Sequence, residues 1–327
     1  MPRMDRPTIG RGDIEAADDR IRPYVRSTPV LELGPGAFDL ACRVTLKLEL
    51  MQHTGSFKPR GAFNKILSSD VPESGVIAAS GGNFGLAVAF AALTLGHRAE
   101  IFVPSNSPRV KADGIRSMGA DVTVVEGWYD EALEASHERA AETGALVMHA
   151  YDQPEVVAGQ GTIGLELADQ VPDADTVLVA IGGGGLIGGV AGWYEGRTRA
   201  IGVEPETSRS MTGALAAGEP VDVEYGGYAA DSLGTRRAGE IAFAIVSKHV
   251  ERVLVLATRS GTRSDGSGTR SACSPNPEAR RRSRPCSQRR TSPSRTSTWS
   301  PWSAERTVTS GCCRKTRRAR GPRRTRP

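Results

Sequence analysis

Long apolar runs are absent from this 327-residue sequence, and cysteines are scarce in most of it. It contains no stretch of about 18 apolar residues, so an ordinary membrane-spanning helix is excluded. The first ten residues, MPRMDRPTIG, lack the apolar core of a signal peptide. Only Cys42 falls within residues 1–257, which leaves nothing for a disulfide framework. We therefore expect a cytoplasmic protein without a membrane partner.

Residues 258–327 lack almost every side chain that builds a hydrophobic core. They contain no Leu, Ile or Phe and one valine, Val308, so they cannot bury enough apolar surface to offset the loss of chain entropy. They hold 19 basic and 3 acidic groups, a net charge of +16, whereas residues 1–257 hold 23 and 34 and carry −11. The formal charge of +5 therefore belongs to a basic, low-complexity tail, which we expect to be disordered.

Residues 76–257 alternate short apolar segments with amphipathic ones, which predicts an α/β fold with parallel sheets covered on both faces by helices. In such folds ligands bind at the carboxyl ends of strands, so the loops there are the candidate sites. The expected strands lie at 76–79, 99–104, 121–125, 145–150, 176–181, 199–205 and 252–257, and the expected helices at 84–95, 108–118, 129–142 and 154–170.

The first candidate loop is TGSFKPRGA, residues 54–62. Lys58 stands between Phe57 and Pro59, which is unusual company for a fully solvated charge. A partly buried lysine has a lowered pKa and can bond covalently to a carbonyl compound. By itself, however, the motif favours the simpler interpretation of a surface lysine before a helix.

The second candidate loop is ASGGNFG, residues 79–85, between an expected strand and an expected helix. Its glycines let a ligand approach the backbone closely, and amides at a helix N-terminus bind carboxylates or phosphates. Ser80 and Asn83 add side-chain hydrogen bonds. An ordinary helix cap with glycines for the turn explains the loop equally well when it is taken alone.

The third candidate loop is IGGGGLIGG, residues 181–189, whose amides can form a nest for a phosphate group. It also contains the spacing GxGxxG, at Gly183, Gly185 and Gly188, with Glu204 about 20 residues further on. That is the dinucleotide fingerprint, which makes a nicotinamide-dependent oxidoreductase a rival interpretation.

The combination of the three loops separates these interpretations. A dehydrogenase gives no reason for Lys58 or for residues 80–83, whereas an aldehyde cofactor with a phosphate, together with a substrate carboxylate, accounts for all three loops. In this order the motifs resemble the fold-type II pyridoxal-phosphate enzymes, in the branch of threonine/serine dehydratases and serine racemases. The resemblance spans about residues 15–257 and implies a tryptophan synthase β-like fold with two three-layer parallel-sheet domains.

The resemblance also implies the domains and the roles of individual residues. Residues 1–69 with 151–257 would form a larger, incomplete cofactor-binding domain, into which a smaller substrate-loop domain, 70–150, is inserted. Lys58 would bind pyridoxal 5'-phosphate covalently and later remove the α-proton of the substrate. The other implied contacts are Phe57 beside the cofactor ring, Asn83 at its 3′ oxygen and near the substrate, Ser80, Gly81 and Gly82 at the substrate carboxylate, and Gly182, Gly183, Gly184, Gly185 and Leu186 at the phosphate.

Two departures from the family pattern bear on the reaction. Racemases commonly carry a second serine in the substrate loop that delivers a proton to the opposite face, and this sequence has Gly81 there, so we expect elimination over racemisation. Some relatives bind a divalent cation through an acid and a second acid six residues later. Here Glu204 is followed by Ser210, and we predict no metal site.

The tail lacks the segments that the resemblance implies beyond residue 257, including the hydroxyl or thiol that contacts the pyridine nitrogen. In a shifted reading frame, CSPNPEARRRSRPC (273–286) permits LAEPGGAAALAAL, and WSPWSAERT (299–307) permits VAVVCGAN. We therefore hypothesise a single frame change shortly after Ala257, and expect weak or absent activity from the chain as written. The rival interpretation is a genuine basic tail that binds nucleic acid.

We therefore predict a lyase of amino-acid metabolism, a pyridoxal-phosphate dependent ammonia-lyase that converts L-threonine or L-serine to 2-oxobutanoate or pyruvate and ammonia. The alternatives are a serine or threonine racemase, a β-replacing synthase and, from another class, the oxidoreductase. The expected partner is an amino-acid substrate and not nucleic acid. A homodimer is compatible with the sequence, which does not determine the oligomeric state.

The frame hypothesis predicts the outcome of resequencing the gene around codon 258. We expect one inserted or deleted base that, once corrected, restores the two family segments in order. A single unbroken frame whose codons do not encode those segments in any shift would contradict the hypothesis.

Overall fold

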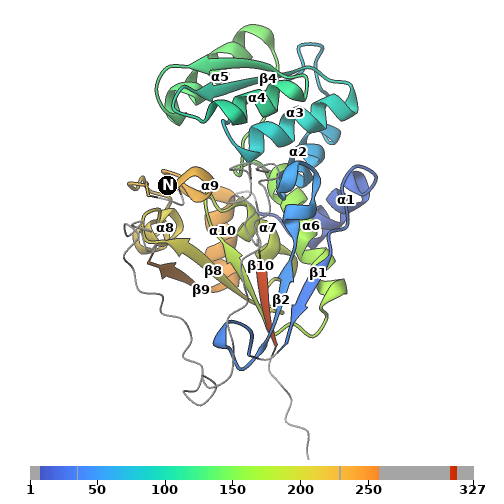
Figure 1. The fold of residues 1–327 in the computed structure, drawn as a ribbon, viewed down its shortest axis with the longest axis vertical. Coiled ribbons are helices and arrows are strands. Elements are labelled where there is room, and N and C mark those ends of the chain that lie inside the picture. The colour runs from blue at the N-terminus through green and yellow to red at the C-terminus, as the bar shows by residue number, and fades with distance from the viewer. Residues whose placement is uncertain (1–7, 35, 228–229, 258–309, 315–327) are drawn as a thin grey trace, which may run out of the picture. The chain divides into compact units, whose positions relative to one another are not determined.

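The computed structural model describes residues 8–34, 36–227, 230–257 and 310–314 (Figure 1). All of them belong to one compact unit. The predicted disorder of the tail, the frame change and the nucleic-acid interpretation concern residues 258–309 and 315–327, which lie outside the described residues. Among the described residues, no helix is long and apolar enough to cross a membrane.

A parallel four-stranded sheet in the order β5-β4-β3-β6 carries the second candidate loop. Its strands are β3 (Val76–Ala79), β4 (Ala99–Pro104), β5 (Asp121–Val125) and β6 (Leu146–Val147), connected by α3 (Asn83–Leu95), α4 (Arg109–Ser117) and α5 (Tyr129–Thr143). Phe102 of β4 packs with α5, whereas Ile101, its neighbour, faces α3 and α4, so helices cover both faces. Since Ala79 pairs with Phe102, the loops after β3 and β4 leave the same edge.

A six-stranded sheet in the order β1-β2-β10-β7-β8-β9 carries the third candidate loop (Figure 1). It consists of β1 (Val30–Leu33), β2 (Arg43–Lys47), β7 (Thr176–Ala180), β8 (Arg199–Pro205), β9 (Val250–Leu256) and β10 (Ser310–Arg314). The sheet is parallel from β7 to β9 and antiparallel from β1 to β7. The sequence of the tail predicts no strand, yet β10 fills the position between β2 and β7.

The helices of this part of the chain pack through small residues. They are α1 (Arg11–Ile21), α2 (Lys58–Leu67), α6 (Pro154–Gln170), α7 (Gly185–Tyr194), α8 (Ser210–Ala217), α9 (Ala230–Leu233) and α10 (Glu240–His249), with short 3-10 turns η1 (Ala37–Asp39), η2 (Glu49–Met51) and η3 (His53–Gly55). A Cβ on Gly189 of α7 would lie 2.5 Å from the Val157 carbonyl oxygen of α6. Glycine therefore lets the two backbones touch.

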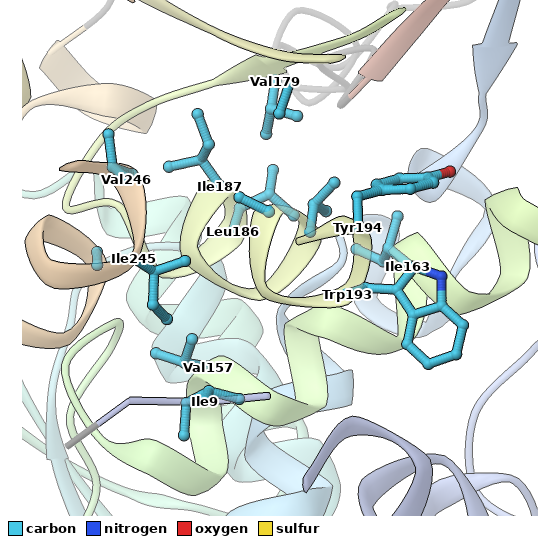
Figure 2. Close-up of a cluster of buried hydrophobic side chains, with 14 of the residues drawn as sticks. Ile9, Val157, Ile163, Val179, Leu186, Ile187, Trp193, Tyr194, Ile245 and Val246 are labelled. Atoms are coloured by element: carbon cyan, nitrogen blue, oxygen red, sulfur yellow. The ribbon is translucent and has the colours of Figure 1, made fainter. Parts of the chain in front are cut away.

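The hydrophobic core lies around α7, as Figure 2 shows. Ile187 and Val190 of α7 are fully buried, and so are Val179 of β7 and Ile163 of α6. At about 1.5–3 kcal/mol for each fully buried aliphatic side chain, this packing fixes α7, and hence the glycine loop at its start, against the sheet.

The predicted α/β fold is confirmed, and the expected elements between residues 76 and 205 are all present within a few residues of their expected bounds. The strand expected over 145–150 is shorter, because β6 pairs with β3 only through Leu146 and Val147. Cys42, just before β2, carries a disulfide bond that the sequence analysis did not predict. The two-domain division stays a prediction.

A buried network of charges connects α2 to the six-stranded sheet and to α6. The guanidinium of Arg60 donates to both carboxylate oxygens of Glu49, at 2.8 Å each, and to Glu166 at 2.7 Å. Lys47 of β2 donates to the other oxygen of Glu166 at 2.6 Å. Burial opposes the charge on Arg60, but the two carboxylates raise its pKa above the ordinary value. The four charged side chains must therefore stay in place together.

The network predicts that Arg60→Met lowers the free energy of unfolding by about 3–5 kcal/mol, because it leaves Glu49 buried without a cation and Glu166 with Lys47 alone. Urea unfolding at neutral pH measures this change. The matched control is Arg139→Met, since the ion pairs of Arg139 with Glu100 and Glu142 are exposed and contribute little. Equal effects of the two substitutions would contradict the prediction.

Candidate active site

The three candidate loops line one cavity of about 830 Å³. Every residue to which the sequence analysis gave a role contributes to its wall: Phe57, Lys58, Ser80, Gly81, Gly82, Asn83, Gly182, Gly183, Gly184, Gly185 and Leu186. The loops come from α2, from the carboxyl end of β3 and from the carboxyl end of β7, as expected for ligand sites in α/β folds. Their roles toward a ligand are proposals.

Lys58 begins α2 and is half-buried in the cavity wall. The turn before it passes through left-handed conformations at Thr54 (φ 61°) and Gly55 (φ 76°), and such strain at a non-glycine residue is typical of functional sites. The Lys58 amine donates to the Ala150 carbonyl at 2.8 Å, and the Phe84 ring centre lies 5.5 Å away. Burial lowers the pKa of Lys58 to about 8, so roughly a tenth of the amine is uncharged at neutral pH.

The loop after β3 opens the N-terminus of α3 toward the cavity. Gly82 is the N-cap residue of α3, and no side chain caps this helix. The Ser80 hydroxyl accepts a hydrogen bond from the Gly82 amide at 3.3 Å. Uncapped amides and the helix dipole give this loop a positive potential, which suits a carboxylate.

Hydrogen bonds and close packing from neighbouring segments fix the loop after β7 and leave little room for side chains in it. The carbonyl of Gly182 accepts a hydrogen bond from Ser210 at 3.1 Å, and that of Gly183 accepts one from Gly239 at 3.0 Å. Gly184 has φ +96°, and a Cβ there would lie 2.6 Å from Ala242. No side chain caps α7, which starts at Gly185. This second uncapped helix start suits a phosphate.

The dinucleotide interpretation required a free acidic side chain at Glu204. Its carboxylate is only 1% exposed and instead accepts hydrogen bonds from the Met211 amide at 2.8 Å and from the Thr212 amide and hydroxyl at 2.9 and 2.7 Å. Glu204 therefore caps the first turn of α8 and is not available to a ribose. Ser210, which stands where the metal-binding relatives carry a second acid, bonds to the glycine loop.

Sequence reasoning gave no role to His149, which also lines the cavity. Its Nδ1 accepts hydrogen bonds from the amides of Asp152 at 3.0 Å and Tyr151 at 3.4 Å, so a proton at Nδ1 would break both. Burial lowers the pKa of His149, which also favours the neutral ring. The only signal in the sequence was its position at the end of an expected strand, because no ligand spacing marks it.

The segment at residues 230–243 contributes to the cavity wall through Ser232, Leu233 and Gly234. Arg236 is mostly exposed, and its guanidinium bridges Asp130 of α5 at 3.0 Å and Asp222 at 3.1 Å. This arginine therefore connects two walls of the cavity at its surface.

The chain is a member of the pyridoxal-phosphate dependent enzyme family, whose pattern matches residues 21–261. This confirms the predicted family and its cofactor.

The chain is 40% identical over 249 residues to the L-threonine ammonia-lyase of Thermotoga maritima, a match that covers 75% of this chain and 62% of the relative. Among solved structures, maize serine racemase aligns with a TM-score of 0.73 and 32% identity, over 77% of this chain and 78% of that one. The T.th. threonine deaminase aligns with a TM-score of 0.71 and 36% identity, over 76% and 82%. The chain thus spans about three fifths of the length of the first of these relatives.

The residues of the cavity fit pyridoxal phosphate. Lys58 offers an amine of lowered pKa for the aldehyde, and the uncapped start of α7 offers amides for the phosphate. The Ser56 hydroxyl, in the same wall, is buried without a hydrogen-bond partner among the described residues, as expected for a group that a bound ligand satisfies.

The pKa of about 8 predicts how the reactivity of Lys58 depends on pH in the cofactor-free protein. Reductive methylation should rise about tenfold per pH unit below pH 8 and level off above it, because only the neutral amine reacts. Mass mapping measures each lysine, with the exposed Lys248 as an internal reference for the reagent. If the Lys58 profile keeps rising to about pH 10.5, the ordinary lysine value, the amine is not desolvated.

The same shift sets a dependence of stability on pH. The unfolded chain holds the Lys58 proton more tightly than the folded one between about pH 8 and 10.5, so this lysine costs folding free energy below pH 8 and progressively less above it. Lys58→Met should therefore raise the unfolding free energy at neutral pH and change it less at about pH 10, as urea unfolding at the two pH values measures. An equal effect at both would contradict the prediction.

Proposed function

We propose that this protein is a pyridoxal-phosphate dependent ammonia-lyase that eliminates water from L-threonine or L-serine and yields a 2-oxo acid and ammonia. The observation that carries the proposal is the arrangement of one cavity, in which an amine of lowered pKa lies with two uncapped helix N-termini. The reaction needs one amine and two anion sites, one for the cofactor phosphate and one for the substrate carboxylate. The similarity to L-threonine ammonia-lyase supports the choice of substrate class.

In this proposal the residues of the chain bind the cofactor and the substrate, orient the substrate and move protons. The bound cofactor supplies an electron sink for negative charge at the substrate α-carbon. Ser80 and the amides after it hold the substrate carboxylate, which fixes the bond to the α-proton in one orientation. The Lys58 amine, whose lowered pKa makes its neutral form accessible near neutral pH, accepts that proton.

The assignments to the remaining residues follow the same scheme. Phe57 lies beside the amine, with its ring centre 5.2 Å from the Lys58 nitrogen, where it would pack near the cofactor ring. Asn83 binds the 3′ oxygen of the ring. The amides of residues 182–186 bind the phosphate, and the division into a substrate-loop domain over 70–150 and a larger domain is supported by the two separate sheets. A cytoplasmic location and a homodimer stay predictions from the sequence.

A serine racemase is the second candidate, because the fold of the maize enzyme is similar. Racemisation needs a proton source on the second face of the α-carbon. Gly81 provides no side chain there, which favours elimination. Chiral analysis of the recovered amino acid separates the two activities. The choice between threonine and serine rests on one methyl group, which changes discrimination by only about 1–3 kcal/mol.

The proposal predicts that Lys58→Ala abolishes both the visible absorption of the lysine-bound cofactor and the release of 2-oxo acid from L-threonine. Borohydride should fix the cofactor onto the peptide that contains Lys58 in the parent protein. Lys65→Ala is the matched control, because Lys65 lies on the same helix and pairs with Glu155 at 3.2 Å. Both the chain as written and the frame-restored chain are tested, and a cofactor fixed to another lysine would overturn the proposal.

A further inference from the structure

Gly81 is a glycine because of its neighbour and not because of its backbone conformation. Its φ lies outside the left-handed region. A Cβ built on Gly81 would, however, lie 2.8 Å from the Cβ of Ser107 and closer still to the Ser107 hydroxyl, with Val103 at 3.2 Å. Ser107 therefore occupies the space that a side chain at position 81 would need.

The two residues meet because their strands are neighbours. β3 and β4 pair in parallel, so the loop that carries Gly81 and the loop that carries Ser107 leave the sheet at the same edge. The Ser107 amide donates to the Pro104 carbonyl at 2.9 Å, which closes a turn just before α4. This turn directs the serine toward the substrate loop, and both residues line the cavity.

The Ser107 hydroxyl has no hydrogen-bond partner among the described residues, although the side chain is half-buried. Ser105, two residues earlier, provides a contrast, since its hydroxyl bonds to Glu126 at 3.1 Å and it does not line the cavity. A polar group that is partly desolvated and unpaired at the wall of a cavity is satisfied by what binds there.

We propose that Ser107 is a further substrate-binding residue, whose hydroxyl donates a hydrogen bond to the substrate carboxylate held by residues 80–82. The inference rests on the proposed function and adds a ligand from a second loop to it. The hydroxyl lies against the backbone of Gly81, at the part of the loop that would hold the carboxylate. Because no described acid or base lies within hydrogen-bond distance of it, it acts as a donor and not as a proton-exchanging group.

The test compares the binding of two amines, L-threonine and serinol, to the frame-restored holoenzyme. The change in cofactor absorption on binding measures the affinity. Ser107→Ala should weaken L-threonine binding about 10- to 100-fold, the range for a hydrogen bond to a charged group. Binding of serinol, which has no carboxylate, should not change. A structural role alone would weaken both amines, and equal effects on both would overturn the proposal. Ser105→Ala is the matched control.

Moving the serine hydroxyl from position 107 to position 81 tests whether the two positions share one space beside the substrate carboxylate. Gly81→Ser alone should lower L-threonine binding, because two serines compete for one space. Adding Ser107→Gly should restore binding to within about threefold of the parent, since the hydroxyl now enters from the other loop and regains most of its hydrogen bond. Failure of the double variant to bind better than Gly81→Ser, while its thermal unfolding matches that of the parent, would overturn the proposal.

The outcomes separate this inference from the proposed function. Absence of cofactor on Lys58 in the parent protein would overturn both. Cofactor on Lys58 with unchanged L-threonine binding in Ser107→Ala would overturn only the role of Ser107.

Discussion

The position of the reactive amine depends on a buried cation two residues away from it. Arg60 is completely buried, and its guanidinium is held between Glu49 and Glu166, so the start of α2 cannot rotate or slide without separating charges in a medium of low polarity. The same helix turn carries Lys58, whose amine must lose its proton easily in the proposed reaction. The ion network therefore fixes the position of the Lys58 amine, and burial lowers the pKa of that amine.

The proposed function uses two anion sites that rely on backbone amides and not on charged side chains. At α3 and at α7 a strand ends, a glycine-rich turn follows, and a helix begins without a capping side chain. Amides bind an anion in this way without placing a full positive charge in the cavity. A lysine or arginine in either loop would bind the anion too, but it would put a second cation next to the amine. Glycine-rich loops can therefore bind anions without changing the pKa of the Lys58 amine.

Much of this arrangement could be predicted from sequence because it is encoded locally. The alternation of apolar strands with helices located the elements, and the glycine runs and Lys58 marked the loops at strand ends. Contacts between distant segments could not be predicted in this way. Glu204 matched the spacing of a ribose ligand, but the turn into α8 brings two amides to it. Ser107 and His149 carry no motif, and only the pairing of neighbouring strands brings them into the cavity. The strand β10 had no apolar pattern from which to be predicted.

The contact between positions 81 and 107 constrains the order in which this cavity can change during evolution. Two side chains would share one volume, so a serine gained at position 81 displaces Ser107 unless a smaller residue has replaced it. A route through a sequence with small residues at both positions avoids this clash. The two sites are therefore epistatic, and a hydroxyl can migrate between the loops of neighbouring strands while the sheet beneath them stays unchanged.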